Sequence, residues 1–532
     1  MPVNSRPPRE IAARWLFVGL CAASLAPVLL VRIPAMVDYP DHLARMYILA
    51  ANGTAAANPA YRVEWALYPN LAMDLLIPQM ARLFGVALSG RIFLLVSEIL
   101  IVGGAMAIER VMKGRVQLAG FAGVLLLYSL PFAWGFLNFE FGLGVALFGI
   151  ALMLKMREAA WPVRLVVNTV FVAALFAAHF FALGVYGATL GWYELWRAWD
   201  RNGAWRDAVL RLAVLAAPAV VVLAVMAATG GSIGYAGTDW FLLLKPLWLF
   251  RTLNGYSLTM SAVTALALMA ALYVAARQRL LTLAPAGAWM AALFAILYVA
   301  IPSRLFGTSF VDLRIIVAAG LIMPAFLRLR LPDGHRFTVV LTAAGLVIAA
   351  NLAVVYSVWL SYRREYAAMI RSFAGMKPGA RVLVAGAGDD PPLRDLTEFP
   401  IFHAPDLAVH YANAFVPDLF TTPGKQPVRP VAALQPLDDP EPAPVPVTLL
   451  TAIASGHEPP GTPSFLRGWY RDFDYVYVLG PPAGNPMPDR LEEVTRARRF
   501  VLYRIARASS PPPSGGEGAG RASSSPCRSA RC

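Results

Sequence analysis

The chain has 532 residues and a net charge of +14; 58% of its residues are hydrophobic, 15% are charged, and the mean hydropathy is +0.57. Because soluble globular proteins average roughly 45–50% apolar residues, this composition excludes an ordinary soluble protein and predicts a polytopic membrane protein. The Lys and Arg residues separate apolar runs and do not form a basic patch interleaved with aromatic residues, so we expect no nucleic-acid partner.

The apolar runs predict about eleven transmembrane helices, since about 20 mostly apolar residues cross a bilayer. The runs lie near 15–33, 91–109, 116–134, 139–155, 164–181, 183–199, 209–229, 258–276, 283–301, 312–327 and 338–360. The stretch 164–199 is too long for one helix and short for two, and His179 and Gly184 fall where a hairpin would turn. The predicted fold class is a polytopic α-helical membrane protein.

The positive charges between the runs are unevenly distributed. Short loops on one side, together with the N-terminal segment 1–14, carry about twice as many Lys and Arg residues as the longer loops on the other side. Positive residues in short loops stay in the cytoplasm, so we expect a cytoplasmic N-terminus. With an odd number of spans, the chain then leaves the membrane on the outer face.

Several segments on that outer side are too long to be connectors, namely the loops 34–90, 230–257 and 302–311 and the stretch 361–507. The first outer loop, 34–90, contains LYPNLAMDLLIPQMARLFG, an apolar stretch interrupted by charges and a proline, which predicts helices along the membrane surface. Residues 361–507 are richer in proline and charge and contain strand-like runs, so they predict a small α/β domain. These runs are 380–388, 473–481 and 499–506. The low-complexity tail 508–532 cannot bury a core, and we expect it to be disordered.

The segment VDYPDHLARMY, residues 37–47, concentrates ionisable side chains just after the first apolar run. Its proline suits the first turn of a helix, so a helix begins near Asp41. Asp41 and Arg45 then share a face and can pair, and Asp41 lies at the positive end of the helix dipole. Asp38 precedes the helix without a cation at helical spacing and is freer to face a substrate, while His42 can orient a phosphate or hydroxyl. The alternative is a solvated helix start, since exposed charged loops are common.

Other polar residues have structural explanations. Glu98 lies in the middle of a predicted span, where a hydrogen-bonded packing residue is a simpler interpretation than a proton relay. His403 and His410 are seven residues apart with Asp406 between them, so they can share a helical face. A metal site would need further ligands at suitable positions, and no metal site is predicted.

Four segments carry a resemblance to a known family. They are DYPDH after the first span, YPNLAMDLLIPQMARLFGVALSGRIFLL leading into the second, and MKPGARVLVAG and FDYVYVLGP in the C-terminal segment. With the many short-looped spans, they make residues 15–505 similar to the GT-C superfamily of membrane glycosyltransferases, which use polyprenyl-phosphate sugars. The resemblance implies a multi-pass protein of the bacterial inner membrane. Its transmembrane domain would cover 15–360, and 361–507 would form a periplasmic α/β domain.

In that family an acidic residue of the first outer loop is the catalytic base, which by position is Asp38 or Asp41 here. These aspartates are separated by a tyrosine and a proline, unlike a plain acidic pair, so the resemblance leaves open which one is the base. The implied reaction transfers a sugar from a lipid-phosphate donor to a glycan or lipid acceptor on the periplasmic face. A carboxylate removes the proton of the acceptor hydroxyl as it attacks the anomeric carbon.

The departing polyprenyl phosphate needs positive charge nearby. The candidate substrate-binding residues on the outer side are His42, His179, Lys245, Arg251, Arg304 and Arg314. Each of the four cations can instead be an anchor at the lipid–water interface. The expected partners are membrane lipid, the lipid-linked sugar and its acceptor. No cofactor is predicted beyond this donor, and a requirement for a divalent metal stays open.

Two other functions fit a polytopic membrane protein. One is a transporter or flippase of lipid-linked glycans, and the other is a non-catalytic membrane assembly protein. Transporters usually consist of two related halves with paired broken helices, and this sequence has no such internal symmetry. The long outer loops and the outer domain also favour the glycosyltransferase.

Overall fold

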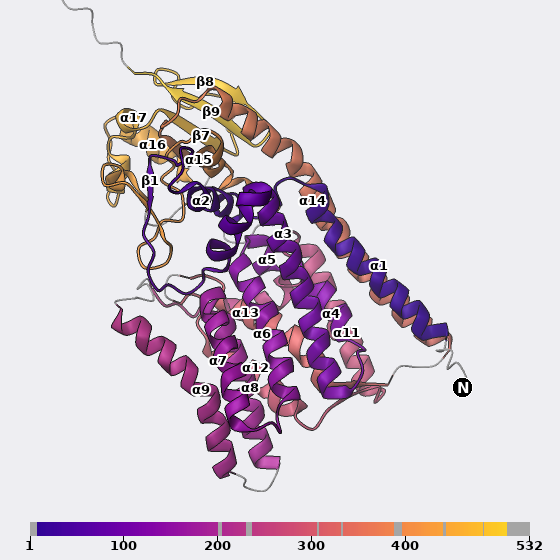
Figure 1. Ribbon diagram of the computed structural model, residues 1–532. Coiled ribbons are helices and arrows are strands. Elements are labelled where there is room, and N and C mark those ends of the chain that lie inside the picture. Colours follow the sequence, from indigo (N-terminus) through magenta and orange to yellow (C-terminus); the bar gives the residue numbers. More distant parts are fainter. Residues whose placement is uncertain are drawn as a thin grey trace, which may run out of the picture.

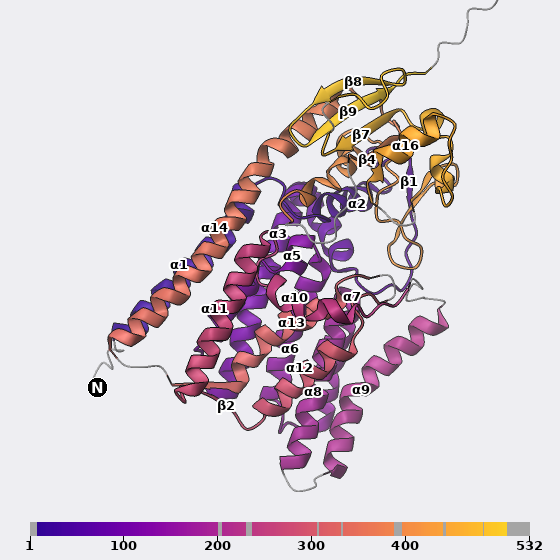
Figure 2. The same cartoon turned by 180° about the vertical axis from the view of Figure 1, so that it is seen from behind.

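The computed structural model describes residues 8–200, 205–229, 237–305, 308–330, 334–387, 396–439, 443–481 and 484–507. Long helices form a bundle, and a smaller domain that contains a β-sheet lies at one end of it (Figure 1, Figure 2). The tail 508–532, which the sequence predicts to be disordered, lies outside the described residues.

Within the described part of the chain, seven helices are long and apolar enough to cross a membrane, by length and composition. They are Glu10–Leu30 (in α1, Pro8–Leu30), Ala72–Lys113 (α3), Leu137–Lys155 (α6), Trp161–Ala178 (α7), Trp205–Ala228 (α9), Leu258–Arg277 (α11) and His335–Gly375 (α14 with η3). Two shorter apolar segments, Ala119–Trp134 and Gly287–Ala300, accompany them. The polytopic helical class is therefore confirmed, with seven candidate spans in place of about eleven.

Each of the predicted apolar runs nevertheless overlaps a helix, and the difference lies in where helices break. The run 116–134 contains two short helices, because a turn follows Leu126 and a new helix begins with the Leu130–Pro131 pair. The run 312–327 contains only eleven α-helical residues, because α13 ends at Ile322. The remaining bundle elements are α4 (Ala119–Leu126), α5 (Leu130–Trp134), α8 (Phe180–Asp200), η1 (Leu242–Leu244), α10 (Lys245–Arg251), β2 (Leu281–Leu283), α12 (Gly287–Ala300), α13 (Val311–Ile322), η2 (Met323–Phe326) and β3 (Leu327–Leu329).

Two single-residue breaks shape the bundle near the predicted loops. Gly85 has φ 71° and ψ 160°, a conformation that favours glycine, and it divides α3 between the stretch predicted to lie on the membrane surface and the following span. His179 has an extended backbone between the end of α7 at Ala178 and the start of α8 at Phe180. The hairpin expected in this region therefore turns at His179.

The C-terminal domain is built on a five-stranded sheet in the order β6-β4-β7-β9-β8. Strand β4 pairs in parallel with β6 and β7, whereas β9 pairs antiparallel with β7 and β8. Three of the strands fall in the predicted strand-like runs. The elements of the domain are β4 (Val382–Gly386), η4 (Phe399–Ile401), η5 (Ala404–Asp406), α15 (Leu407–Tyr411), β5 (Val428–Pro430), η6 (Gln435–Leu437), β6 (Val445–Pro446), α16 (Val447–Ala454), η7 (Ser464–Leu466), α17 (Trp469–Asp472), β7 (Tyr475–Leu479), β8 (Leu491–Arg496) and β9 (Phe500–Ile505).

One helix continues from the bundle into this domain. Helix α14, His335–Ser372, runs beside α1 and extends past the predicted domain boundary at residue 360 (Figure 1). At its end, the Phe373 ring packs edge-on against Tyr477 of the central strand β7. The bundle and the domain are therefore connected by a continuous helix and a packed core.

The first predicted outer loop forms a second connection. Strand β1 (Tyr61–Val63) pairs antiparallel with β5. The Asn58 amide donates to the carbonyl oxygens of Val409 and Ala414 at 3.2 and 3.0 Å, and the Tyr61 hydroxyl donates to Val416 O at 2.9 Å. Helix α2 (Tyr39–Ala51) is thereby enclosed between the bundle and the C-terminal domain (Figure 1).

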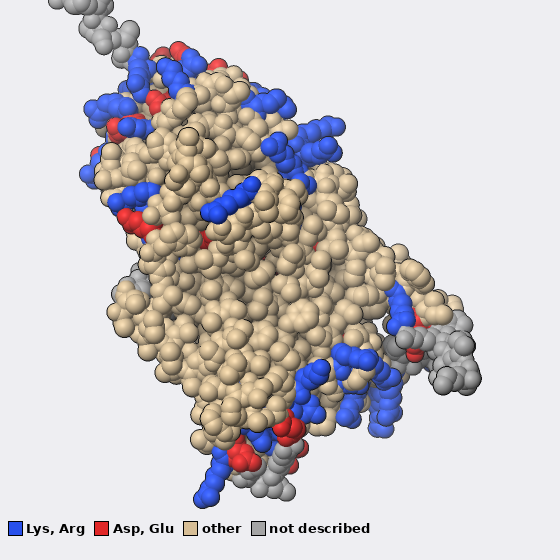
Figure 3. All heavy atoms as spheres, in the orientation of Figure 1, with Lys and Arg blue, Asp and Glu red and all other residues tan. Residues whose placement is uncertain are grey.

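The charged residues on the visible face gather at the two ends of the molecule, and the surface between them is almost free of Lys, Arg, Asp and Glu (Figure 3). A belt of this kind matches the hydrocarbon core of a bilayer, where charged side chains are expensive. Helix α2 lies at the end of the bundle next to the C-terminal domain (Figure 1).

Candidate active site

The backbone before α2 is held against the end of α5. The N–H groups of Val37 and Asp38 donate to the carbonyl oxygens of Ala133 and Trp134 at 3.1 and 2.9 Å. The next residue, Gly135, has φ 96°, and a Cβ placed on it would lie 3.2 Å from the backbone nitrogen and the Cβ of Asp38. The predicted helix start is confirmed, because α2 begins at Tyr39 with proline in its first turn.

The Asp38 carboxylate accepts no hydrogen bond from the described residues, although Asp38 is only 8% exposed. Burial raises its pKa to about 6, while the nearby charges of His403, Arg314 and Arg45 act in the opposite direction. An unengaged carboxylate with a pKa close to neutrality is suited to removing a proton from a hydroxyl group.

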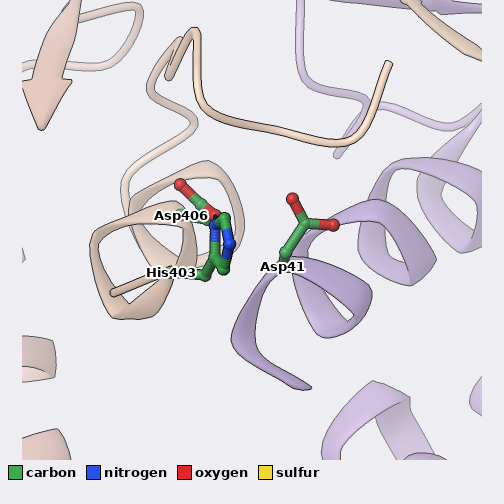
Figure 4. Close-up of side chains that lie close together, drawn as sticks. All are labelled: Asp41, His403 and Asp406. Carbon is green, nitrogen blue, oxygen red and sulfur yellow. Dashed lines mark ion pairs between the residues drawn. The ribbon is translucent and has the colours of Figure 1, made fainter. Parts of the chain in front are cut away.

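Asp41 has a different environment, because it points toward the C-terminal domain (Figure 4). It is fully buried, and its Oδ2 accepts the backbone N–H of Phe420 at 2.8 Å. Burial and the neighbouring Asp406 carboxylate raise the pKa of Asp41 well above its usual range. The Asp41 carboxylate is therefore engaged by groups of the C-terminal domain.

The predicted pair between Asp41 and Arg45 does not form. Arg45 instead donates through Nε and Nη2 to both carboxylate oxygens of Asp74, at 3.0 and 3.1 Å, and both side chains are buried. Asp74 lies in the first turn of α3 and offers two oxygens in the planar arrangement that a guanidinium prefers. This pair joins α2 to α3.

His42 lies beneath the Asp38 segment. Its Nε2 is 3.2 Å from the carbonyl oxygen of Gly135, and its ring contacts Phe420 edge-on. A hydrogen bond to a carbonyl oxygen requires a proton on Nε2, and burial lowers the pKa of the ring well below its usual value. A neutral His42 therefore braces the Gly135 turn that supports Asp38.

Arg314 and His179 lie together on a cavity of about 340 Å³. Arg314 Nη1 is 3.4 Å from His179 Nε2, and the guanidinium lies 4.5 Å from the centre of the Phe136 ring. Arg314 also interacts electrostatically with Asp38. The rest of the cavity wall is mainly apolar and includes Phe181, Val185, Leu297, Ile301, Val311 and Ile315.

Lys425, which the sequence did not single out, also lines this cavity. It comes from the C-terminal domain, so the cavity lies between the bundle and that domain. No local pattern marks Lys425, because its place depends on how the domain docks onto the bundle. The cavity therefore combines an apolar wall with a lysine and an arginine, a lining suited to a lipid that carries a phosphate.

The other predicted cations lie outside the lining of this cavity. Lys245 donates to the carbonyl oxygens of Tyr298 and Ile301 at 2.7 and 2.8 Å and pairs with Asp312 at 3.1 Å. The buried Arg251 lies over the Trp248 ring at 5.7 Å. Arg304 is exposed and lies 3.7 Å from Asp239.

The fold described above matches that of solved structures of ArnT over 93% of the chain, at low sequence identity. Two solved structures share it. ArnT from Cupriavidus metallidurans bound to undecaprenyl phosphate has a TM-score of 0.51 and 13% sequence identity, and the match covers 93% of this chain and 98% of that chain. The same ArnT in the apo state has a TM-score of 0.50 and 14% identity, with the same coverage. No family model and no curated protein matches the sequence.

Proposed function

We propose that this protein is an integral membrane glycosyltransferase that transfers a sugar from a polyprenyl-phosphate donor to an acceptor, with Asp38 as the general base. The observation that carries the proposal is a buried Asp38 carboxylate that accepts no hydrogen bond from the described residues and interacts electrostatically with Arg314, which lines a mainly apolar cavity. The undecaprenyl phosphate bound to ArnT, which has the same fold, supports a lipid phosphate as the donor's carrier.

The donor binds with its phosphate near Arg314 and its lipid portion against the apolar wall of the cavity. His179 holds the guanidinium from one side, and Lys425 adds positive charge from the C-terminal domain. Fixed cations in a site that excludes water stabilise the negative charge of a departing phosphate.

Asp38 takes the proton of the acceptor hydroxyl, and the hydroxyl oxygen forms a bond to the anomeric carbon of the sugar. The bond between that carbon and the phosphate oxygen breaks, and polyprenyl phosphate leaves with the electron pair. General-base catalysis of this kind typically contributes roughly 10²–10⁴-fold in rate.

We also propose that the site faces the periplasm of a bacterial inner membrane, with the N-terminus in the cytoplasm. The excess of Lys and Arg in the short loops at the opposite side supports this orientation. Alkaline phosphatase fused after residue 507 should be active, because that enzyme matures only outside the cytoplasm. An inactive fusion that is expressed at the same level would contradict the orientation.

The activity is tested with the full-length protein in nanodiscs and lipid-linked sugars extracted from bacterial membranes. Mass spectrometry should detect the release of polyprenyl phosphate together with an acceptor whose mass has increased by one sugar. A flippase would move these lipids between the leaflets of a proteoliposome without changing their masses, and an assembly protein would do neither.

A further inference from the structure

A second group of ionisable side chains lies where α2 meets the C-terminal domain. Asp41 comes from the first turn of α2, and His403 and Asp406 come from the segment around η5 (Figure 4). One ligand atom from each of the three lies within 4.8 Å of the other two. Asp418 joins them, because its Oδ2 is 3.3 Å from His403 Nδ1, the same distance as Asp406 Oδ2.

These four residues are almost completely buried: Asp41 and Asp406 are 0% exposed, Asp418 is 3% exposed and His403 is 5% exposed. Both carboxylate oxygens of Asp406, both of Asp418 and Oδ1 of Asp41 accept no hydrogen bond from the described residues. Buried carboxylates normally accept several hydrogen bonds, so these oxygens have acceptor capacity that the protein leaves unused.

The surrounding cations do not compensate for this negative charge. Arg45 is engaged with Asp74 through both carboxylate oxygens. Arg429 donates to the carbonyl oxygens of Thr421 and Val428, both at 2.7 Å. Three carboxylates therefore face one imidazole, which carries at most a single positive charge.

We propose that Asp41, His403, Asp406 and Asp418 bind a divalent transition-metal cation that joins the start of α2 to the C-terminal domain. The donor set of three carboxylates and one imidazole combines hard oxygen ligands with a nitrogen that suits Zn²⁺ or Mn²⁺ better than Ca²⁺ or Mg²⁺. A dication would balance most of the charge of the three carboxylates and occupy the oxygens that lack hydrogen bonds.

The metal site would also position the proposed catalytic residue. Asp38 lies one helical turn before Asp41, and His403 interacts electrostatically with Asp38. A cation that fixes Asp41 against η5 fixes the orientation of the α2 N-terminus and hence of Asp38. This positioning role rests on the proposed function, whereas metal binding itself does not.

The binding test uses the full-length protein, purified with an affinity tag that involves no metal. Elemental analysis should find about one equivalent of Zn or Mn per chain, in line with the single site proposed here. Treatment with EDTA should remove the metal and lower the unfolding temperature, and ZnCl₂ or MnCl₂ alone should restore both. Protein that holds no metal and does not change its unfolding temperature with either salt would overturn the proposal.

Variants locate the site. Asp406→Asn and His403→Gln should each weaken binding of the added metal by at least about ten-fold. His410→Gln is the matched control, because His410 lies in the same segment but packs its ring on Tyr47 and Tyr411 and should bind metal as the wild type does. Unchanged binding in Asp406→Asn would place any metal elsewhere and overturn the proposal.

A spectroscopic measurement on wild-type protein avoids dependence on the folding of a variant. With Mn²⁺ as the probe, electron spin echo envelope modulation should show coupling to the nitrogen of one imidazole ligand. A spectrum without nitrogen coupling would exclude His403 as a ligand and overturn the assignment. Loss of metal without loss of transfer activity would leave the metal site in place and remove only its positioning role.

Discussion

Replacement of Arg314 by glutamine should weaken the binding of undecaprenyl phosphate. Arg314 is 4% exposed, lies over the Phe136 ring, and has no carboxylate of the described residues within ion-pair distance. Its charge is therefore available to a ligand and is poorly screened by water. A hydrogen bond to a charged group contributes roughly 1.5–3 kcal/mol, so its loss corresponds to about a 10- to 150-fold increase in Kd.

The lower half of this range is expected, since Lys425 and His179 stay on the cavity and keep part of the attraction. The assay is the titration of purified protein in detergent with undecaprenyl phosphate, followed by microscale thermophoresis. Arg304→Gln is the matched control, because Arg304 was also predicted to bind phosphate but is exposed and lies outside the lining of the cavity. Equal weakening by both replacements, or none by Arg314→Gln, would refute the assignment of the phosphate to Arg314.

Three further predictions follow from the geometry around α2. In the chelator-treated protein, the residual transfer rate should fall as pH drops through about 6, because burial raises the pKa of Asp38 to about 6 and only the ionised form accepts a proton. A residual rate that persists to about pH 4, the range of an ordinary aspartate, would contradict this. Asp74→Asn should lower the free energy of unfolding by about 3–5 kcal/mol, because it leaves the buried Arg45 unpaired. Glu64→Gln is the control, because Glu64 belongs to an exposed ion pair and its replacement should change the unfolding temperature little. Similar shifts of the unfolding temperature for both variants would refute the distinction between the two pairs. Gly135→Ala should cost about 1–2 kcal/mol and reduce transfer beyond that loss, because the new Cβ meets Asp38, whereas Gly375→Ala, where no atom lies within 4 Å, should be close to wild type in both assays.

The features that the sequence predicts well are those that depend on neighbouring residues. The apolar runs locate the helices, because burial in lipid requires an apolar side-chain surface along the whole segment. The proline after Tyr39 correctly predicts the start of α2, and the turn near His179 follows from the length of the apolar stretch around it. The distinction between a free Asp38 and a structurally engaged Asp41 also agrees with the local argument, although Asp41 is engaged by a different partner.

The features that the sequence does not predict depend on contacts between distant segments. Asp74, the partner of Arg45, is 29 residues away and lies on another helix. Asp406 and Asp418 reach Asp41 only after the C-terminal domain has docked onto the first loop, which the pairing of β1 with β5 accomplishes. Likewise, the sequence predicted that Lys245 binds phosphate or anchors the chain at the lipid–water interface, whereas its ion pair with Asp312 follows from the packing of α10 near α13.

The central claim is that the Asp38 carboxylate is the general base, and the most direct measurement is the rate of polyprenyl phosphate release by Asp38→Asn in nanodiscs. The substitution keeps the size of the side chain and removes the base, so the rate should fall by roughly 10²–10⁴-fold while undecaprenyl phosphate binds as it does to the wild type. An Asp38→Asn protein that binds the lipid and still releases polyprenyl phosphate at the wild-type rate would contradict the account.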